Sequence, residues 1–233
     1  MAAADDLTAL FLESYRLRLL RGIEDRLAHD GLRLVAGVDE VGRGCLAGPV
    51  VAAAVLFDAR DLTLVPGVDD SKKVPEERRA RLAELVERCA LATAWCAVPA
   101  ETIERINIRQ ATLLAMRRVV SELEPQPDAV IVDAENPELD LPTLSIHRGD
   151  AWSYAVACAS LVAKVHRDRL MDRWHSRFPE YDFRSNKGYG APQHRRALEE
   201  IGPSPIHRLT FRSVVPRLAA DGGAHGTARA GGV

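Results

Sequence analysis

The feature that most constrains this chain is an apolar run, LVAGV (34–38), that leads directly into two adjacent carboxylates, Asp39 and Glu40. The run favours a β-strand. Two charges at the end of a core strand are costly to bury unless a cation or a bound metal compensates them. The following turn, Gly42-Arg43-Gly44, lets the backbone approach a ligand closely and supplies a cation suited to phosphate. Carboxylates beside such a turn favour chemistry on a phosphodiester.

The length and composition indicate a globular protein with one main domain. The chain has 233 residues, of which 47% are hydrophobic and 27% charged, which is enough apolar sequence for a core. No window is apolar for long enough to span a bilayer. The first residues are acidic where a signal peptide would be basic. We therefore expect a cytoplasmic protein without a membrane partner, and a monomer by default.

The four cysteines, Cys45, Cys89, Cys96 and Cys158, form no CxxC pair and lack the spacing of zinc ligands. We expect them to be small buried side chains in a reducing compartment.

Charge is distributed unevenly along the chain. The net charge is −2, which taken alone argues against a nucleic-acid binder. Between residues 164 and 212, however, there are eleven Lys/Arg and six Asp/Glu, a local balance of +5, whereas acids concentrate in the first forty residues and between 128 and 150. A basic C-terminal third beside an acidic centre suits an enzyme that holds a polyanion and a divalent metal. The alternative is that the basic run is only a solvated helix face.

Hydrophobic periodicity and turn residues predict a mixed α/β sheet. Residues 7–29 predict one amphipathic helix within an N-terminal extension, 1–32. Strands are expected at 33–41, 50–57, 91–98, 129–135 and 141–147, the first two as a hairpin, and helices at 75–89, 100–123, 151–175 and 192–201. Three early strands with short connections, then strands alternating with helices, indicate mixed strand directions. The main domain is expected to cover 33–217, followed by a disordered Gly- and Ala-rich tail, 218–233.

Acids follow at three places that a sheet could bring together: Asp39-Glu40, Asp133 and Asp150. Ligands at neighbouring strand ends can converge on one side of a sheet, and Mg²⁺ and Mn²⁺ prefer oxygen ligands. Consecutive strand residues point to opposite faces, so Asp39 and Glu40 share a site only if the strand twists or ends there. Asp150 could instead be a helix N-cap, and Asp133 could open a turn.

Several blocks of the sequence resemble the bacterial ribonuclease HII family. The first is GVDEVGRGCLAGPV (37–50). Six further blocks follow in the family's order and at its spacing: DDSKK (69–73), NIRQATLLAM (107–116), IVDAEN (131–136), RGD (148–150), ACASLVAKVHRD (157–168) and NKGYG…H (186–194). One block alone would be a weak signal, but the ordered set, over about residues 33–215, is specific.

The resemblance implies a ribonuclease H-like fold: a mixed central β-sheet flanked by helices, with a helical C-terminal portion. It also implies a type 2 ribonuclease H, an endonuclease that cuts the RNA strand of RNA–DNA hybrids and nicks DNA 5′ of embedded ribonucleotides. By position, Asp39, Glu40, Asp133 and Asp150 match the family's catalytic, metal-binding carboxylates. The implied substrate contacts are Gly42, Arg43 and Gly44 at the ribose 2′-OH, Tyr189 at the sugar of the RNA-to-DNA junction, and Ser71, Lys72 and Lys164 near the phosphate backbone.

The cofactor that the resemblance implies is a pair of divalent ions, Mn²⁺ or Mg²⁺. Two ions about 3.5–4 Å apart would stabilise the attacking and leaving oxygens of an in-line displacement, with a 3′-hydroxyl and a 5′-phosphate as products. The 2′-OH distinguishes RNA from DNA, and Gly42 and Gly44 leave room for backbone contact to it; a tight turn with positive φ is their alternative role. His166 and His194 are candidate general acids, although a carboxylate–metal site can run the reaction without histidine.

The chain departs from the family pattern at a few positions. Cys45, Ala134, Arg148 and Ala191 stand where proline, glycine, lysine and threonine are common. A cysteine at position 45 could loosen the turn and expose a thiol near the site.

Three other functions stay open. A ribonuclease HIII-like enzyme would carry a separate N-terminal substrate-binding domain, whereas here 38 residues precede Asp39. A catalytically silent hybrid-binding module would have lost a metal ligand, and all four acids are present. A junction resolvase would keep the acids but has no need of a turn that reads the 2′-OH.

Overall fold

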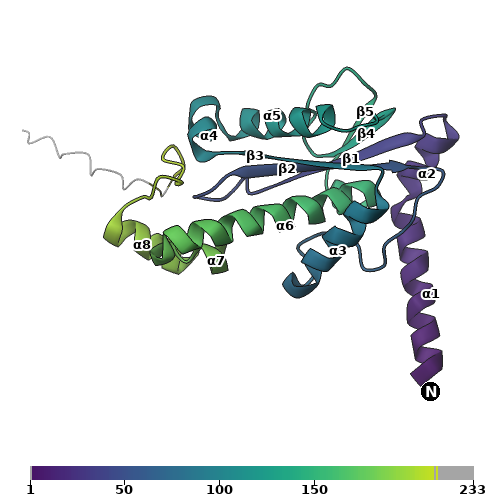
Figure 1. The fold of residues 1–233 in the computed structure, drawn as a ribbon, viewed down its shortest axis with the longest axis horizontal. Coiled ribbons are helices and arrows are strands. Elements are labelled where there is room, and N and C mark those ends of the chain that lie inside the picture. The colour runs from purple at the N-terminus through teal and green to yellow at the C-terminus, as the bar shows by residue number, and fades with distance from the viewer. Residues whose placement is uncertain (1, 213, 215–233) are drawn as a thin grey trace, which may run out of the picture.

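The centre of the protein is a five-stranded mixed sheet (Figure 1), seen in a computed structural model that describes residues 2–212 and 214. The strands are β1 (Leu34–Val41), β2 (Val50–Asp58), β3 (Ala92–Val98), β4 (Ala129–Asp133) and β5 (Thr143–Ile146). Their order is β3-β2-β1-β4-β5, in which β2 runs antiparallel to β1 and β3, whereas β1, β4 and β5 are parallel. The predicted mixed sheet and the predicted hairpin are both confirmed.

Helices cover both faces of the sheet (Figure 1). α6 (Tyr154–Arg177) and α3 (Glu76–Cys89) lie on one face, and α4 (Ala100–Ile106) and α5 (Ile108–Ser121) lie on the other. Because alternate residues of a strand point to opposite faces, β2 supplies both cores and has no polar residue before Asp58. It gives Val51, Ala53, Val55 and Phe57 to the α6 side, and Val50, Ala52, Ala54 and Leu56 to the α5 side.

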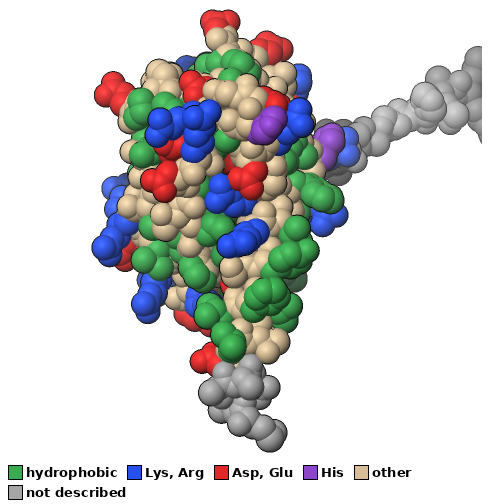
Figure 2. Space-filling model, turned by 90° about the vertical axis from the view of Figure 1, so that its right-hand side faces the viewer, with side chains coloured by type: hydrophobic (Ala, Val, Ile, Leu, Met, Phe, Trp, Pro, Cys, Tyr) green, Lys and Arg blue, Asp and Glu red, His purple; other side chains and the backbone are tan. Residues whose placement is uncertain are grey.

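The N-terminal segment forms two helices, not the single helix predicted over residues 7–29. α1 (Ala2–Leu20) and α2 (Gly22–His29) are separated by Arg21, and the glycine that begins α2 weakens helix continuity there. α1 projects from the body of the protein (Figure 1), and hydrophobic side chains gather along it on the face shown in Figure 2. α2, in contrast, packs Ala28 into a cluster with Ile131 and Val156.

The helix predicted over residues 100–123 is also divided in two. Asn107 separates α4 from α5 and has φ +66°, a conformation that asparagine tolerates better than most residues. Its side chain accepts a hydrogen bond from the N–H of Gln110 at 3.1 Å, so it caps the start of α5.

The predicted helical C-terminal portion is confirmed. After α6 come a 3₁₀ turn (Pro179–Tyr181), α7 (Phe183–Asn186) and α8 (Pro192–Ile201), the last with the predicted bounds. Tyr181 and Phe183 stack with ring centroids 5.3 Å apart and pack with Leu46, which follows the turn after β1. The tail predicted at 218–233 lies outside the described residues. Within the described part, none of the helices is long and apolar enough to cross a membrane.

Candidate active site

The parallel pairing of β1 and β4 brings two of the predicted acids together. The two strands are in register up to the residues just before Asp39 and Asp133, so these carboxylates lie at the same edge of the sheet. Asp39 is 5% exposed, and Ser160 of α6 hydrogen-bonds to its carboxyl group. Ser160 Oγ also lies 2.9 Å from Ser71 Oγ, within hydrogen-bond distance. The sheet and α6 therefore fix Asp39 within a polar network.

A hydrogen bond ties Asp150 to this pair. The backbone N–H of Gly149 donates to Asp133 Oδ1 at 2.7 Å, and Gly149 begins the 3₁₀ turn that carries Asp150. Asp150 is buried and its pKa responds to the charge of Asp133. The N-cap of α6 is Ser153, whose side chain accepts from the N–H of Val156 at 3.2 Å. The alternative assignment of Asp150 as that N-cap is therefore wrong.

Glu40 faces a small group of charges beside Asp39. Arg43 Nη1 lies 3.4 Å from Glu40 Oε1, and Arg43 Nη2 lies 3.0 Å from Glu135 Oε1. Arg109 Nε contacts the other oxygen of Glu135 at 3.2 Å. Glu40 Oε2 is buried and has no hydrogen-bond partner among the described residues. That oxygen is available to a further ligand.

Burial and mutual repulsion raise the pKa values of three of the four carboxyl groups. Burial is the largest cause of the strongly raised pKa of Asp39, and repulsion by Glu40 adds to it. Burial also raises the pKa of Glu40 to about 7. The pKa of Asp150 is raised by burial and by the neighbouring Asp70 and Asp133. The charge of Asp133 raises the pKa values of both Asp39 and Glu40, although consecutive strand residues alternate in direction.

The chemistry of this donor set fits divalent cations. The four acids offer carboxylate oxygens, which Mg²⁺ and Mn²⁺ prefer, and a cation would remove the repulsion that raises their pKa values. Within residues 2–212 and 214, no three acidic, histidine or cysteine side chains are close enough to form a closed metal cage as they stand. Because unpaired carboxylates repel one another, their side chains would have to draw together to chelate an ion.

Two buried arginines, which the sequence analysis did not identify, hold the turn after β1. Arg208 is fully buried and donates to three backbone carbonyls, those of Gly42 (2.7 Å), Arg43 (2.8 Å) and Gly48 (3.0 Å). Arg167, also fully buried, donates to the carbonyls of Ala47, Pro49 and Lys187. Burial lowers the pKa of Arg208 to about 10. Since an isolated arginine in a basic segment normally indicates a solvated surface, the sequence carried no signal of this role.

The two glycines of the turn differ in their surroundings. Gly42 has φ +94°, and a Cβ at that position would lie 2.1 Å from Arg167 Nε. Gly44 is exposed, and a Cβ there would meet no atom within 4 Å. The turn itself therefore requires a glycine at position 42, which is the tight-turn role considered above for both glycines. The backbone at Gly44, in contrast, is open to a ligand.

Two departures from the family pattern are accommodated in the structure. Cys45 is fully buried, with its Sγ 3.7 Å from the carbonyl oxygen of Lys187, so the expectation that it exposes a thiol is wrong. Ala134 has φ +55°, a conformation that glycine adopts at lower cost. The alanine therefore adds local backbone strain directly after Asp133.

Tyr189 lies beside Cys45 of the turn after β1, with much of its ring uncovered. It is 44% exposed, and the guanidinium carbon of Arg167 lies 5.9 Å from its ring centroid. Its carbonyl oxygen is 2.7 Å from His194 Nδ1. His194 is fully buried and its Nε2 lies 2.8 Å from His207 Nε2, so this histidine has a structural role in the C-terminal portion and is not placed as a general acid.

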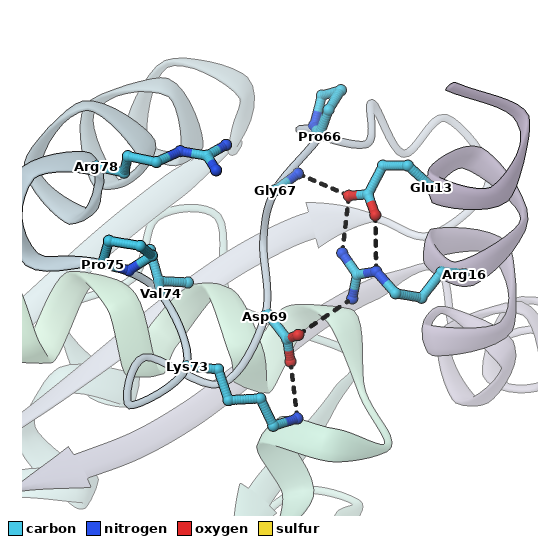
Figure 3. A pocket seen from close by; sticks show the side chains of 9 residues that line it. All are labelled: Glu13, Arg16, Pro66, Gly67, Asp69, Lys73, Val74, Pro75 and Arg78. Atoms are coloured by element: carbon cyan, nitrogen blue, oxygen red, sulfur yellow. Dashed lines mark hydrogen bonds and ion pairs between the residues drawn. The ribbon is translucent and has the colours of Figure 1, made fainter. Parts of the chain in front are cut away.

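The loop that carries Ser71 and Lys72 is tethered to α1 (Figure 3). Arg16 pairs with Glu13 and lies 3.8 Å from Asp69, which also contacts Lys73 at 3.1 Å. Together with neighbouring residues these side chains line a cavity of about 350 Å³. The N-terminal helix thus supports a loop that reaches the acidic site.

The three residues predicted to contact phosphate differ in their exposure and in whether they already have an ion-pair partner. Lys72 is exposed and close enough to lower the pKa of Asp150, whereas Ser71 is buried. Lys164 is ion-paired with Asp168, Nζ to Oδ1 at 2.7 Å.

Asp70 lies beside Asp150, a neighbour that the sequence alone did not reveal. Its Oδ1 accepts from the N–H of Lys72 at 2.9 Å, and its carboxyl group raises the pKa of Asp150. In the sequence, Asp70 stands out only as part of the DDSKK block. The block does not indicate that this loop lies against Asp150.

Comparisons with known proteins decide the family. The family model described as Ribonuclease HII matches residues 36–214. The chain belongs to the ribonuclease HII family. Ribonuclease HII of Koribacter versatilis (strain Ellin345) is 46% identical over 205 residues, which cover 85% of this chain and 80% of that protein. Ribonuclease HII of Geobacter metallireducens is 46% identical over 203 residues, covering 87% and 94%. The resemblance is confirmed, and the protein is a type 2 ribonuclease H.

Solved structures of ribonucleases H2 and HII share the fold of this ribonuclease HII family member. The chain in the PCNA:RNase HII complex from Archaeoglobus fulgidus gives a TM-score of 0.65 at 26% identity and covers 77% of this chain and 95% of its own. Ribonuclease H2 from Pyrococcus horikoshii OT3 gives 0.64 at 25% identity, covering 78% and 95%. The predicted ribonuclease H-like fold is therefore confirmed.

Proposed function

We propose that this protein cleaves the RNA strand of RNA–DNA hybrids and nicks duplex DNA 5′ of embedded ribonucleotides. The observation that carries the proposal is the convergence of Asp39, Glu40, Asp133 and Asp150 beside an exposed Gly44, in a chain of the ribonuclease HII family. Acids at one edge of the sheet could bind the metal ions needed for hydrolysis. The exposed backbone beside them could contact the ribose 2′-OH.

The four acids are the residues proposed to hold two divalent ions, Mn²⁺ or Mg²⁺. Bound there, such ions lower the pKa of water and neutralise charge on the leaving oxygen. The chain itself orients the donors: Ser160 holds Asp39, the N–H of Gly149 holds Asp133, and Arg43 holds one oxygen of Glu40 while the other stays free.

In the proposed reaction the oxygen of a water molecule attacks phosphorus, and the bond from phosphorus to the 3′ oxygen breaks. The products are a 3′-hydroxyl and a 5′-phosphate. We assign Gly42, Arg43 and Gly44 to the ribose 2′-OH and Tyr189 to the sugar at the RNA-to-DNA junction. Ser71, Lys72 and Lys164 are assigned to the phosphate backbone; for Lys164 this requires release from Asp168.

Cleavage of an end-labelled RNA–DNA hybrid with Mn²⁺, with Mg²⁺ or with excess chelator tests the proposal. Metal-dependent fragments whose 3′ ends a polymerase extends and whose 5′ ends a ligase joins are expected. Binding of the hybrid with no cleavage under any metal would favour the silent module instead. The expected monomeric state and the domain bounds 33–217 stay predictions.

A further inference from the structure

The first turn of α6 is held in place by contacts on two sides. On the sheet side, Gly37 of β1 lies so close that a Cβ there would be 2.1 Å from the carbonyl carbon of Ala155. On the other side, Glu24 of α2 accepts hydrogen bonds from Ser153 Oγ at 2.6 Å and from the N–H of Ala155 at 2.8 Å. This turn therefore has little freedom to move relative to β1.

Glu24 is an unusual residue for a position that serves packing alone. It is fully buried, its Oε2 has no hydrogen-bond partner among the described residues, and burial raises its pKa. An apolar side chain of similar volume would avoid that desolvation. The carboxyl group supplies directional hydrogen bonds that hold two donors at the start of α6. The helix dipole also favours an anion at this end of a helix.

The first turn of α6 is close to the acidic site in sequence and in space. Asp150 lies three residues before Ser153. Gly149 packs against Val156, and a Cβ on Gly149 would lie 3.2 Å from the Val156 side chain. The same helix carries Ser160, the hydrogen-bond partner of Asp39. Displacing the first turn of α6 would therefore displace Asp150 and Ser160 together.

We propose that Glu24 is a positioning residue for the metal-binding carboxylates and acts through Ser153 and Ala155 on Asp150. The proposal rests on the function assigned above. Glu24 lies outside residues 36–214 that match the family model. On this proposal the N-terminal extension contributes to the geometry of the active site.

The variants Glu24→Ala, Glu24→Gln and Leu27→Ala test this role. Glu24→Gln keeps an acceptor at Oε1 and serves as the conservative rescue. Leu27→Ala removes α2 packing but leaves the hydrogen bonds of Glu24 to Ser153 and Ala155 in place, so it serves as the matched control for lost stability. Each variant is measured for urea stability, for amide exchange over residues 149–156, for Mn²⁺ binding by calorimetry, and for the KM and kcat of hybrid cleavage across Mn²⁺ concentrations.

We expect Glu24→Ala to weaken Mn²⁺ binding and to raise the half-activating Mn²⁺ concentration roughly tenfold, as loss of an outer hydrogen-bond partner does at metal sites. Its amides at 149–156 should exchange faster, while the KM for the hybrid stays unchanged. Glu24→Gln should resemble wild type, and Leu27→Ala should lose stability without a change in Mn²⁺ affinity. If Glu24→Ala does not fold, Glu24→Asp, which withdraws the acceptor by one methylene, takes its place.

Equal Mn²⁺ affinity in the Glu24→Ala and Leu27→Ala variants would overturn the proposal and leave Glu24 a packing residue. Failure of the proposed function gives a different result, since the wild type would then cleave neither hybrid nor ribonucleotide-containing DNA. In that case exchange and calorimetric Mn²⁺ binding still decide the role of Glu24, because neither depends on cleavage.

Discussion

The N–H of Gly149 donates to Asp133 Oδ1 over 2.7 Å, which joins the end of β4 to the turn that carries Asp150. Two acids from separate segments are thereby held in one geometry. The two carboxyl groups also affect each other electrostatically, because the charge of Asp133 raises the pKa of Asp150.

Asp133→Asn tests this relationship. Asparagine keeps an oxygen to accept from Gly149 but loses the anionic charge, so the fold should persist while cleavage falls by about 100-fold or more. Urea unfolding and single-turnover cleavage would be compared with wild type. Activity within a few-fold of wild type would remove Asp133 from the proposed metal site.

Gly37 and Gly44 should respond differently to alanine. Gly37→Ala places a Cβ against the backbone of Ala155 and should cost about 3 kcal/mol of unfolding free energy. Gly44→Ala has open space, so its stability should stay near wild type while discrimination between a ribonucleotide and a deoxynucleotide at the cut site falls. Denaturation and cleavage of paired substrates measure both effects. A Gly44→Ala protein with unchanged selectivity would contradict the role proposed for the turn.

Arg208 should be essential to the turn after β1. Arg208→Met removes the donor from three backbone carbonyls and should cost roughly 3 kcal/mol of stability, with lost activity. Arg196 is exposed, and Arg196→Met should change the stability by less than about 0.5 kcal/mol. Thermal and urea unfolding of the two variants decide the matter, and equal stabilities would show that water replaces the guanidinium.

The stability of the metal-free protein should fall as the pH rises through 7. Burial raises the pKa of Glu40 from 4.5 to about 7, so the native protein keeps a proton that the unfolded chain releases. The stabilisation is complete below pH 4.5 and is lost as the pH passes about 7, on the order of 3 kcal/mol in all. Urea unfolding in chelator from pH 4.5 to 8 should show a steeper fall for wild type than for Glu40→Gln. Parallel curves would exclude this titration.

Most of the sheet could be predicted because its strands are apolar runs bounded by glycine, proline or acids, and β2 is buried on both faces. The two errors, at Arg21 and Asn107, are breaks that one residue makes inside a periodic pattern. Periodicity continues across such a break, so it does not report the local change of backbone direction.

The acids of the site could be predicted because they follow strand runs and match a family pattern. Ser160, Asp70 and Arg208 could not, because each owes its role to a contact with a segment distant in the sequence. A serine in a helix or an arginine in a basic segment looks the same in sequence whether it is solvated or buried. Glu24 shows this most clearly. Its place in an amphipathic helix predicts an exposed polar residue, whereas in the structure it is fully buried.

The central claim is tested most directly with duplex DNA that contains a single ribonucleotide, incubated with Mn²⁺ or Mg²⁺ and wild-type protein, Asp39→Asn or the exposed control Asp61→Asn. We predict a metal-dependent nick 5′ of the ribonucleotide with wild type and Asp61→Asn, and none with a folded Asp39→Asn protein. An undiminished nick by Asp39→Asn, or a folded wild type that binds this duplex and cuts neither it nor a long hybrid, would contradict the account.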